Sequence, residues 1–207
     1  MEKYILEIPN FIPVGLCDSI VKRFENDNRK VEGSFTYPVG DQNVTRMKNN
    51  TELSITPCVG WEDVSGLFLD YTSKAYGTYL KHLSDTFSGY GDPKYPIYER
   101  EITSDQNILC TGFPIQRIGK GDLYDWHHDF DIFGSRFIQI IFYLNTLQEN
   151  QGGCTEFIDG RKVRPEAGKV LIYPCSWILP HKGCEVEYGH KYICTTAVII
   201  SNKFARD

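Results

Sequence analysis

The sequence predicts a mainly β fold in which helices near the N-terminus support a double-stranded β-helix, or jelly roll. Two observations favour this class. Residues 1–100 contain two segments with helical periodicity, whereas most of residues 101–207 consists of β-branched and aromatic runs bounded by turn residues. Helices followed by strands, without β–α–β alternation, are typical of an antiparallel sheet with helices packed outside it. We therefore expect a single domain, 1–207, with helical support and substrate loops in its first part and the jelly-roll core in its second.

Two helices are predicted in the first half of the chain. Apolar residues recur at helical spacing from Cys17 to Phe24, opposite charged residues, and this helix is expected to end near Asn26. The second should span about 61–83, where apolar side chains recur every three or four residues until glycine and proline stop the pattern. Residues 27–50, between the helices, are polar and lack a sustained period, so we expect a long loop there.

The predicted strands of the core are runs rich in Val, Ile, Thr, Tyr and Phe that end at Gly, Pro, Asn or Ser. No internal repeat interrupts their order. The runs are residues 108–118, 136–145, 169–174 and 191–201.

The composition limits the classes of partner. The net charge of -5 and the lack of a Lys and Arg cluster argue against a nucleic-acid partner. No apolar stretch reaches eighteen residues, and the N-terminus lacks the apolar core of a secretory signal, so we expect a cytoplasmic protein without a membrane partner. Because no coiled-coil pattern is present, a monomer is expected.

Seven cysteines are scattered along the chain without a Cys-x-x-Cys pair. Their odd number and spacing indicate neither a disulfide framework nor a zinc ribbon. In a cytoplasmic protein we expect reduced thiols, most of them small core residues.

A His-x-Asp pair, His127 and Asp129, carries the candidate chemistry. In a strand this spacing points both side chains to one face, so an imidazole nitrogen and a carboxylate oxygen can reach one metal ion. The best third ligand is His181, because two histidines and one carboxylate make the facial triad of non-haem Fe(II) sites, which leaves positions open for reagents. His128 has the opposite parity and is expected to lie outside the metal site.

Further motifs follow this pair in a fixed order, and together they resemble the 2-oxoglutarate- and Fe(II)-dependent dioxygenases, most closely their prolyl 4-hydroxylase branch. The resemblance extends from about Gln116 to the C-terminus. It rests on Tyr124-x-x-His127-x-Asp129-Phe130, Phe142-Tyr143-Leu144-Asn145, Gly152-Gly153-Cys154-Thr155-Glu156-Phe157, Pro165-x-x-Gly168, His181-x-Gly183-Cys184-x-Val186 and Gly189-x-Lys191-Tyr192.

The resemblance implies that His127, Asp129 and His181 bind Fe(II). It also implies that Lys191 pairs with the far carboxylate of the cosubstrate 2-oxoglutarate, a role that suits a compact charge on a long stem. Thr155 would hydrogen-bond the same carboxylate, and Tyr124 would belong to the cosubstrate site. The implied reaction consumes 2-oxoglutarate and O2, yields succinate and carbon dioxide, and hydroxylates a substrate, with ascorbate as a further reductant.

The substrate side of the site is predicted by two residues, and the chain departs from the family pattern at two others. Arg136 matches a family arginine that contacts a peptide substrate, and Trp177 is expected to line the pocket. Ile118 stands where the prolyl hydroxylases often have a tyrosine that helps to hold 2-oxoglutarate. Ala197 stands where they have a tryptophan near the substrate, which weakens the inference to proline.

The leading hypothesis is therefore hydroxylation of a peptidyl side chain, with proline as the expected target. The same chemistry on a free amino acid or another small metabolite is the first alternative. A jelly roll that binds metal without catalysis is the second, and Lys191 argues against it because a structural metal site needs no anion anchor. A zinc hydrolase ranks last for want of a general base, and a nucleic-acid demethylase is disfavoured by the acidic charge balance.

Overall fold

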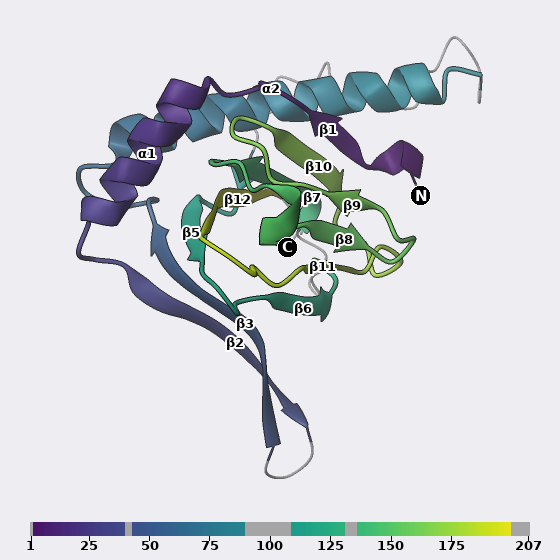
Figure 1. Cartoon of the computed structure of the whole chain (residues 1–207). Coiled ribbons are helices and arrows are strands. Elements are labelled where there is room, and N and C mark those ends of the chain that lie inside the picture. The colour runs from purple at the N-terminus through teal and green to yellow at the C-terminus, as the bar shows by residue number, and fades with distance from the viewer. Residues whose placement is uncertain (1, 40–42, 90–108, 131–135, 200–207) are drawn as a thin grey trace, which may run out of the picture.

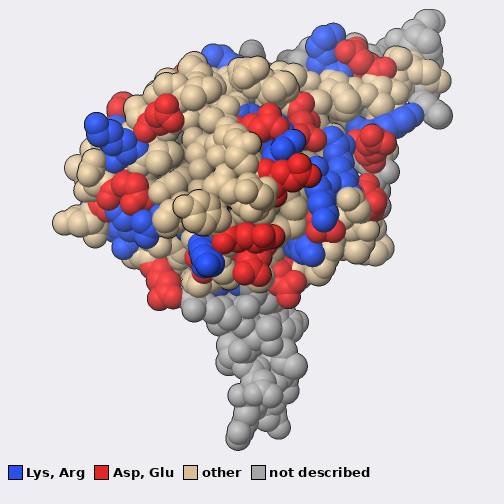
Figure 2. Space-filling model, in the orientation of Figure 1, with Lys and Arg blue, Asp and Glu red and all other residues tan. Residues whose placement is uncertain are grey.

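A computed structural model shows a curled antiparallel sheet, a half-barrel, with two long helices packed against one side of it (Figure 1). Helix α1 is Val14–Asn26 and helix α2 is Glu62–Thr86. Acidic and basic side chains are interspersed over the face shown in Figure 2. The structure describes residues 2–39, 43–89, 109–130 and 136–199.

Within these residues the sheet has twelve strands, and every pairing between them is antiparallel. Their order is β1-β10-β7-β12-β5-β3-β6-β11-β8-β9, with β2 paired to β3 and β4 paired to β12. The strands are β1 (Leu6–Ile8), β2 (Val31–Val39), β3 (Asn43–Ser54), β4 (Leu109–Cys110), β5 (Pro114–Ile118), β6 (Tyr124–His127), β7 (Arg136–Tyr143), β8 (Thr155–Phe157), β9 (Lys162–Val163), β10 (Val170–Pro174), β11 (His181–Gly183) and β12 (Lys191–Ile199). Two short 3-10 helices, η1 (Glu2–Tyr4) and η2 (Glu149–Gln151), complete the elements.

The central strand β7 shows how the alternation of side chains divides the core. Ile138, Ile140 and Phe142 belong to the apolar cluster that packs under the helices, whereas Ile141 and Tyr143 belong to a second cluster inside the half-barrel. Successive side chains of a strand point to opposite faces, so one strand serves both clusters. The inner cluster consists of Ile5, Ile141, Tyr143, Phe157, Val163, Leu171, Tyr173, Leu179 and Ile193.

The predicted fold class is confirmed. Helix α1 ends at Asn26, as the sequence predicts, and α2 extends slightly beyond the expected 61–83. The expected strand 108–118 is interrupted by Gly112, whose φ of 92° breaks the ladder between β4 and β5. The ends of two predicted strands, residues 108 and 200–201, lie outside the described residues. No helix among the described residues has the length and apolar character needed to span a membrane.

The expectation of a long loop over 27–50 is wrong, because β2 and β3 form a hairpin there. Val31 pairs with Glu52 and Val39 with Asn43, with one register shift along the way. The end of β3 then joins the main sheet through β5 and β6. Much of the hairpin extends away from the half-barrel (Figure 1), and the pairing of its two backbones defines its strands.

Candidate active site

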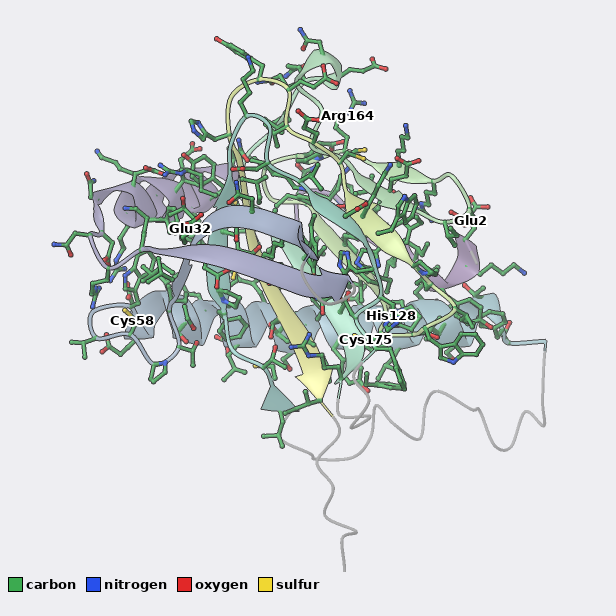
Figure 3. The ribbon with its side chains drawn as sticks, turned by 90° about the horizontal axis from the view of Figure 1, so that it is seen from below. Glu2, Glu32, Cys58, His128, Arg164 and Cys175 are labelled. Carbon is green, nitrogen blue, oxygen red and sulfur yellow. The ribbon has the colours of Figure 1, made fainter. Side chains whose placement is uncertain are left out.

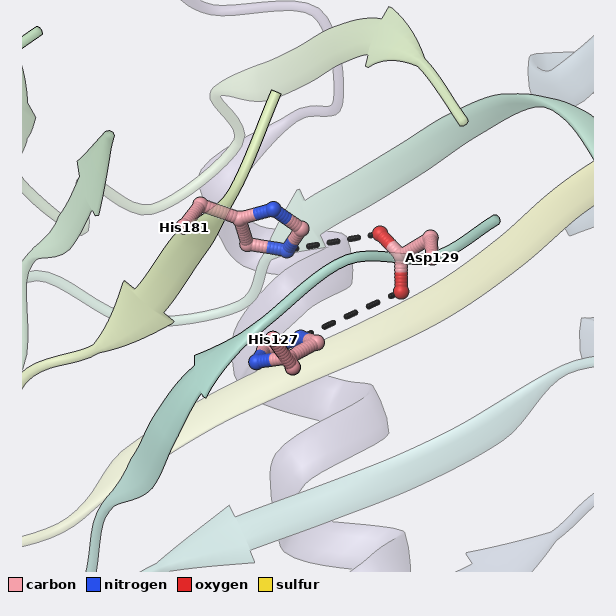
Figure 4. A group of neighbouring side chains, drawn as sticks. All are labelled: His127, Asp129 and His181. Atoms are coloured by element: carbon pink, nitrogen blue, oxygen red, sulfur yellow. Dashed lines mark ion pairs between the residues drawn. The ribbon is translucent and has the colours of Figure 1, made fainter. Parts of the chain in front are cut away.

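The pairing of β6 with β11 brings the two candidate histidine ligands together. His127 is the last residue of β6, His181 is the first residue of β11, and they are direct partners in the antiparallel ladder. Their ring centroids lie 4.3 Å apart. Asp129 lies two residues beyond the end of β6, and its carboxylate faces both rings (Figure 4). Cross-strand pairing therefore assembles the cluster, in addition to the two-residue spacing that the sequence shows.

The geometry of the cluster leaves one nitrogen of each imidazole available to a metal ion. His181 Nε2 lies 3.3 Å from one carboxylate oxygen of Asp129, and His127 Nε2 lies 3.9 Å from the other. The Nδ1 atoms face backbone carbonyls instead, of Asp125 at 2.7 Å and Leu179 at 3.3 Å. A carbonyl only accepts hydrogen bonds, so each Nδ1 carries a proton, and Nε2 is the nitrogen of each ring that is left for a metal ion.

Burial keeps His127 in its metal-binding form. Burial, assisted by the neighbouring His181, lowers the pKa of His127 to about 4, so its imidazole is neutral near pH 7. The hydroxyl of Tyr173 donates a hydrogen bond to Asp129 at 3.0 Å and lies 2.9 Å from His181 Nε2. These four side chains fit a divalent cation, with one carboxylate, two imidazoles and a phenol that orients them.

A buried lysine marks a second polar group in the same cavity. Lys191, the first residue of β12, is only 4% exposed, and burial lowers its pKa to about 8. Within the part of the chain that the structure describes, no carboxylate pairs with it. Its ammonium lies 5.7 Å from the ring centroid of Tyr143, whose hydroxyl is 2.8 Å from Thr155 Oγ1. A buried cation beside two hydroxyl groups is suited to an anionic ligand.

Both polar groups line one cavity of about 450 Å³. His127, Asp129 and His181 contribute to its wall, as do Lys191 and Thr155. A volume of this size suits a small-molecule ligand. The residues therefore fit an Fe(II) ion at one position and the far carboxylate of 2-oxoglutarate at the other.

Three further predicted site residues differ in their position relative to the cavity. Tyr124 lines the cavity, and its ring stacks on His127 with centroids 3.5 Å apart. Arg136 is exposed and also lines the cavity. Trp177 is 67% exposed, on the segment between β10 and β11, and is not among the residues that line the cavity. His128, labelled in Figure 3, is exposed and lies outside the metal-ligand cluster.

Sequence reasoning gave no role to Tyr143 or Tyr173. In the sequence each is one more aromatic residue of an apolar strand, and only the direction of its side chain distinguishes it from core. The neighbour of Lys191 in the ladder is Ile118, the residue that replaces a family tyrosine. The ring of Tyr143, on the neighbouring strand β7, lies beside the Lys191 ammonium, and its hydroxyl pairs with Thr155.

Comparisons with known proteins agree with this geometry. Residues 113–198 match the model of the 2OG-Fe(II) oxygenase superfamily. A search of curated protein sequences finds no match.

The fold is similar to those of solved prolyl hydroxylases. A prolyl hydroxylase from Trichoplax adhaerens, in complex with a peptide of the hypoxia inducible factor oxygen degradation domain, aligns over 95% of this chain and 84% of its own, with 14% identity and a TM-score of 0.67. A prolyl-4-hydroxylase from Pseudomonas putida aligns over 95% and 93%, with 16% identity and a TM-score of 0.61. The viral collagen prolyl hydroxylase of Paramecium Bursaria Chlorella virus-1 aligns over 96% and 97%, with 15% identity and a TM-score of 0.60.

The matched segment contains the whole metal-ligand cluster and Lys191. The match identifies residues 113–198 as a 2OG-Fe(II) oxygenase region, and together with the metal-ligand cluster it indicates a dioxygenase that depends on Fe(II), 2-oxoglutarate and O2.

Proposed function

We propose that this dioxygenase hydroxylates a prolyl residue of a peptide or protein. The observation that carries the cosubstrate site is the buried Lys191, which has no carboxylate partner among the described residues and lies in the same cavity as the metal-ligand cluster. The similarity in fold to three prolyl hydroxylases, one of them bound to a peptide, supports the choice of substrate.

Different residues of the chain would bind the metal, orient its carboxylate ligand and bind the cosubstrate. His127, Asp129 and His181 would hold Fe(II), and Tyr173 would fix the orientation of the carboxylate. Lys191 would bind the far carboxylate of 2-oxoglutarate, with a hydroxyl of Thr155 beside it. When bound, iron and 2-oxoglutarate supply the oxidative chemistry, in which the cosubstrate becomes succinate and carbon dioxide and the substrate gains a hydroxyl.

A peptide can reach this cavity because part of its wall is exposed. Arg136 is solvent-accessible and still lines the cavity, which places a guanidinium where a substrate backbone carbonyl could accept a hydrogen bond. Trp177 is exposed and lies shortly before His181 in the sequence. It would contact residues that flank the target proline. The same proposal includes a single-domain, monomeric, cytoplasmic enzyme stimulated by ascorbate.

The test is succinate formation by the purified protein with Fe(II), ascorbate and 2-oxoglutarate, with and without a panel of proline-containing peptides. Peptide-stimulated turnover with a gain of one oxygen on proline is the expected result. Turnover stimulated only by a free amino acid would show that the substrate is a small metabolite and not a peptide. Metal binding without any succinate formation would contradict the proposed catalysis.

A further inference from the structure

Two cysteines beside the cavity form a thiol pair that the proposed reaction does not use. Cys154 immediately precedes β8 and Cys184 immediately follows β11. These two strands are antiparallel neighbours, and the backbone N–H of Cys184 donates to the carbonyl of Cys154 at 2.8 Å. The two Sγ atoms and a carboxylate oxygen of Glu156 all lie within 4.8 Å of one another. The pair is therefore built by the fold, although thirty residues separate its members in sequence.

We propose that Cys154 and Cys184 form a redox modification site, in which a hydroperoxide oxidises the two thiols to a disulfide. Cys154 is the attacking thiol and Cys184 is the resolving thiol. Both side chains are partly exposed, so a small oxidant can reach them.

The surrounding charges favour the thiolate of Cys154. A hydrogen bond from Cys184, together with the positive charges of Lys191 and Lys162, lowers the pKa of Cys154 to about 7. The pKa of Cys184 is raised, because its proton is shared with Cys154 and Glu156. Attack by the thiolate form is the reactive step of cysteine oxidation. Because Cys184 Sγ also donates to the Glu156 carboxylate at 3.5 Å, Cys184 is the thiol that keeps its proton, and Cys154 is left to attack.

The other thiols with a perturbed pKa are perturbed in the opposite direction. Burial raises the pKa of Cys17 to about 11, and it also raises the pKa values of Cys175 and Cys194. These three cysteines are buried. Oxidation should therefore spare these three cysteines.

The lysines around Glu156 argue against a metal ion as the occupant. The Glu156 carboxylate lies 3.3 Å from Lys182 Nζ and 3.8 Å from Lys162 Nζ, while its Oε2 accepts from Cys184 Sγ at 3.5 Å. A cation bound by these three groups would have to displace or repel two ammonium groups. The same positive charges stabilise a thiolate.

One hydroperoxide molecule is consumed for each disulfide that forms. The Cys154 thiolate attacks a peroxide oxygen, the O–O bond breaks and hydroxide leaves, which yields a sulfenic acid. The Cys184 thiol then attacks the sulfenyl sulfur, an S–S bond forms, the S–O bond breaks and water leaves. With hydrogen peroxide, two thiols lose two electrons and two protons, and the oxidant becomes two water molecules.

The disulfide would alter the cosubstrate site, a consequence that rests on the proposed function. Cys184 lines the cavity together with Thr155 and Lys191. Gly153, next to Cys154, packs so closely that a Cβ there would lie 3.6 Å from Lys191 Cδ. A disulfide requires an S–S distance of about 2.05 Å, so closing the bond draws these two segments together beside Lys191. We expect about tenfold weaker binding of 2-oxoglutarate, because the anchor is displaced from its ligand.

The first experiment treats the reduced full-length protein with hydrogen peroxide, blocks free thiols with N-ethylmaleimide and digests it with trypsin. Cys154 and Cys184 fall in separate tryptic peptides, 137–161 and 183–191, each with a single cysteine. The expected product is one cross-linked species that separates on reduction. Cys184→Ser should abolish the cross-link, whereas Cys58→Ser, at another partly exposed thiol, should leave it unchanged. Oxidation of Cys58 to the same extent as Cys154, without a cross-link, would overturn the proposal.

The second measurement is calorimetric binding of 2-oxoglutarate to the reduced and the oxidised protein, with Mn(II) in place of Fe(II) to prevent turnover. Weaker binding after oxidation, restored by a thiol reductant, is expected. Equal affinity in both forms would overturn the influence of the pair on the cosubstrate site. Absence of binding in both forms would instead contradict the cosubstrate site, and the peptide map would still decide the thiol chemistry.

Discussion

Replacement of Lys191 by methionine should raise the stability of the ligand-free protein and lower its affinity for the cosubstrate. Burial lowers the pKa of Lys191 from 10.5 to about 8, so a charged lysine here costs the folded, ligand-free protein about 3 kcal/mol at pH 7. Methionine has a similar length and no charge to desolvate. We therefore expect Lys191→Met to raise the free energy of unfolding of the ligand-free protein by up to about 3 kcal/mol.

The same substitution should weaken 2-oxoglutarate binding at least a hundredfold. It would leave a buried carboxylate without its cation, and breaking such a pair costs about 3 to 5 kcal/mol. Stability by denaturant unfolding and affinity by calorimetry, both on reduced protein, measure the two effects. Since the unfolded chain binds the lysine proton more tightly, the stability of the parent protein should also rise between about pH 8 and 10.5, and this rise should vanish in the variant.

Lys169→Met is the matched control. Lys169 is also buried, but its ammonium pairs with Glu7 at 3.1 Å and with Glu166 at 2.8 Å. Its removal should destabilise the protein and leave 2-oxoglutarate affinity unchanged. If Lys191→Met destabilised the protein as Lys169→Met does and retained its cosubstrate affinity, Lys191 would be a structural lysine and our reasoning would be refuted.

Three further substitutions test the cavity. Asp129→Ala should abolish Fe(II) binding in equilibrium dialysis, whereas His128→Ala should preserve it; equal losses would show that the ligands are misassigned. Tyr173→Phe removes the hydroxyl that orients Asp129, so metal affinity should fall about tenfold or more with little loss of fold stability; unchanged affinity would contradict this role. Tyr143→Phe should weaken 2-oxoglutarate binding about tenfold without affecting the metal, because the Thr155 hydroxyl, which lines the cavity, loses its hydrogen-bond partner; calorimetry with Mn(II) decides.

The sequence predicts the elements that have a buried apolar face. In α1, Cys17, Ile20 and Phe24 all contact the core, and the helical period of the sequence reports this burial directly. The β2–β3 hairpin escaped prediction because its strands are defined by hydrogen bonds to each other and to β5 and β6. A polar segment without a buried stripe carries no such period, so only the folded backbone shows its ladder.

At the site, the sequence predicts residues whose chemistry is rare in a core. His127, Asp129, His181 and Lys191 are polar residues whose types and order stand out in the sequence, and the structure buries His181 and Lys191 almost completely. Tyr143 escaped prediction because a tyrosine is an ordinary residue of a β core. Its hydroxyl becomes informative only when folding places it 2.8 Å from Thr155.

The register of two neighbouring strands sets the separation between the metal-ligand cluster and the anion site. Tyr173 on β10 pairs with Gln139 on β7, and Tyr143 lies four residues further along β7. At about 3.3 Å per residue the two tyrosine backbones are about 13 Å apart along the sheet. Ile141 lies between them in the same inner cluster and lines the cavity, so the cavity wall is apolar between its two polar ends. A ligand that satisfies both must be polar at its two ends and apolar in its middle, and a dicarboxylate with a keto acid at one end has this distribution of polarity.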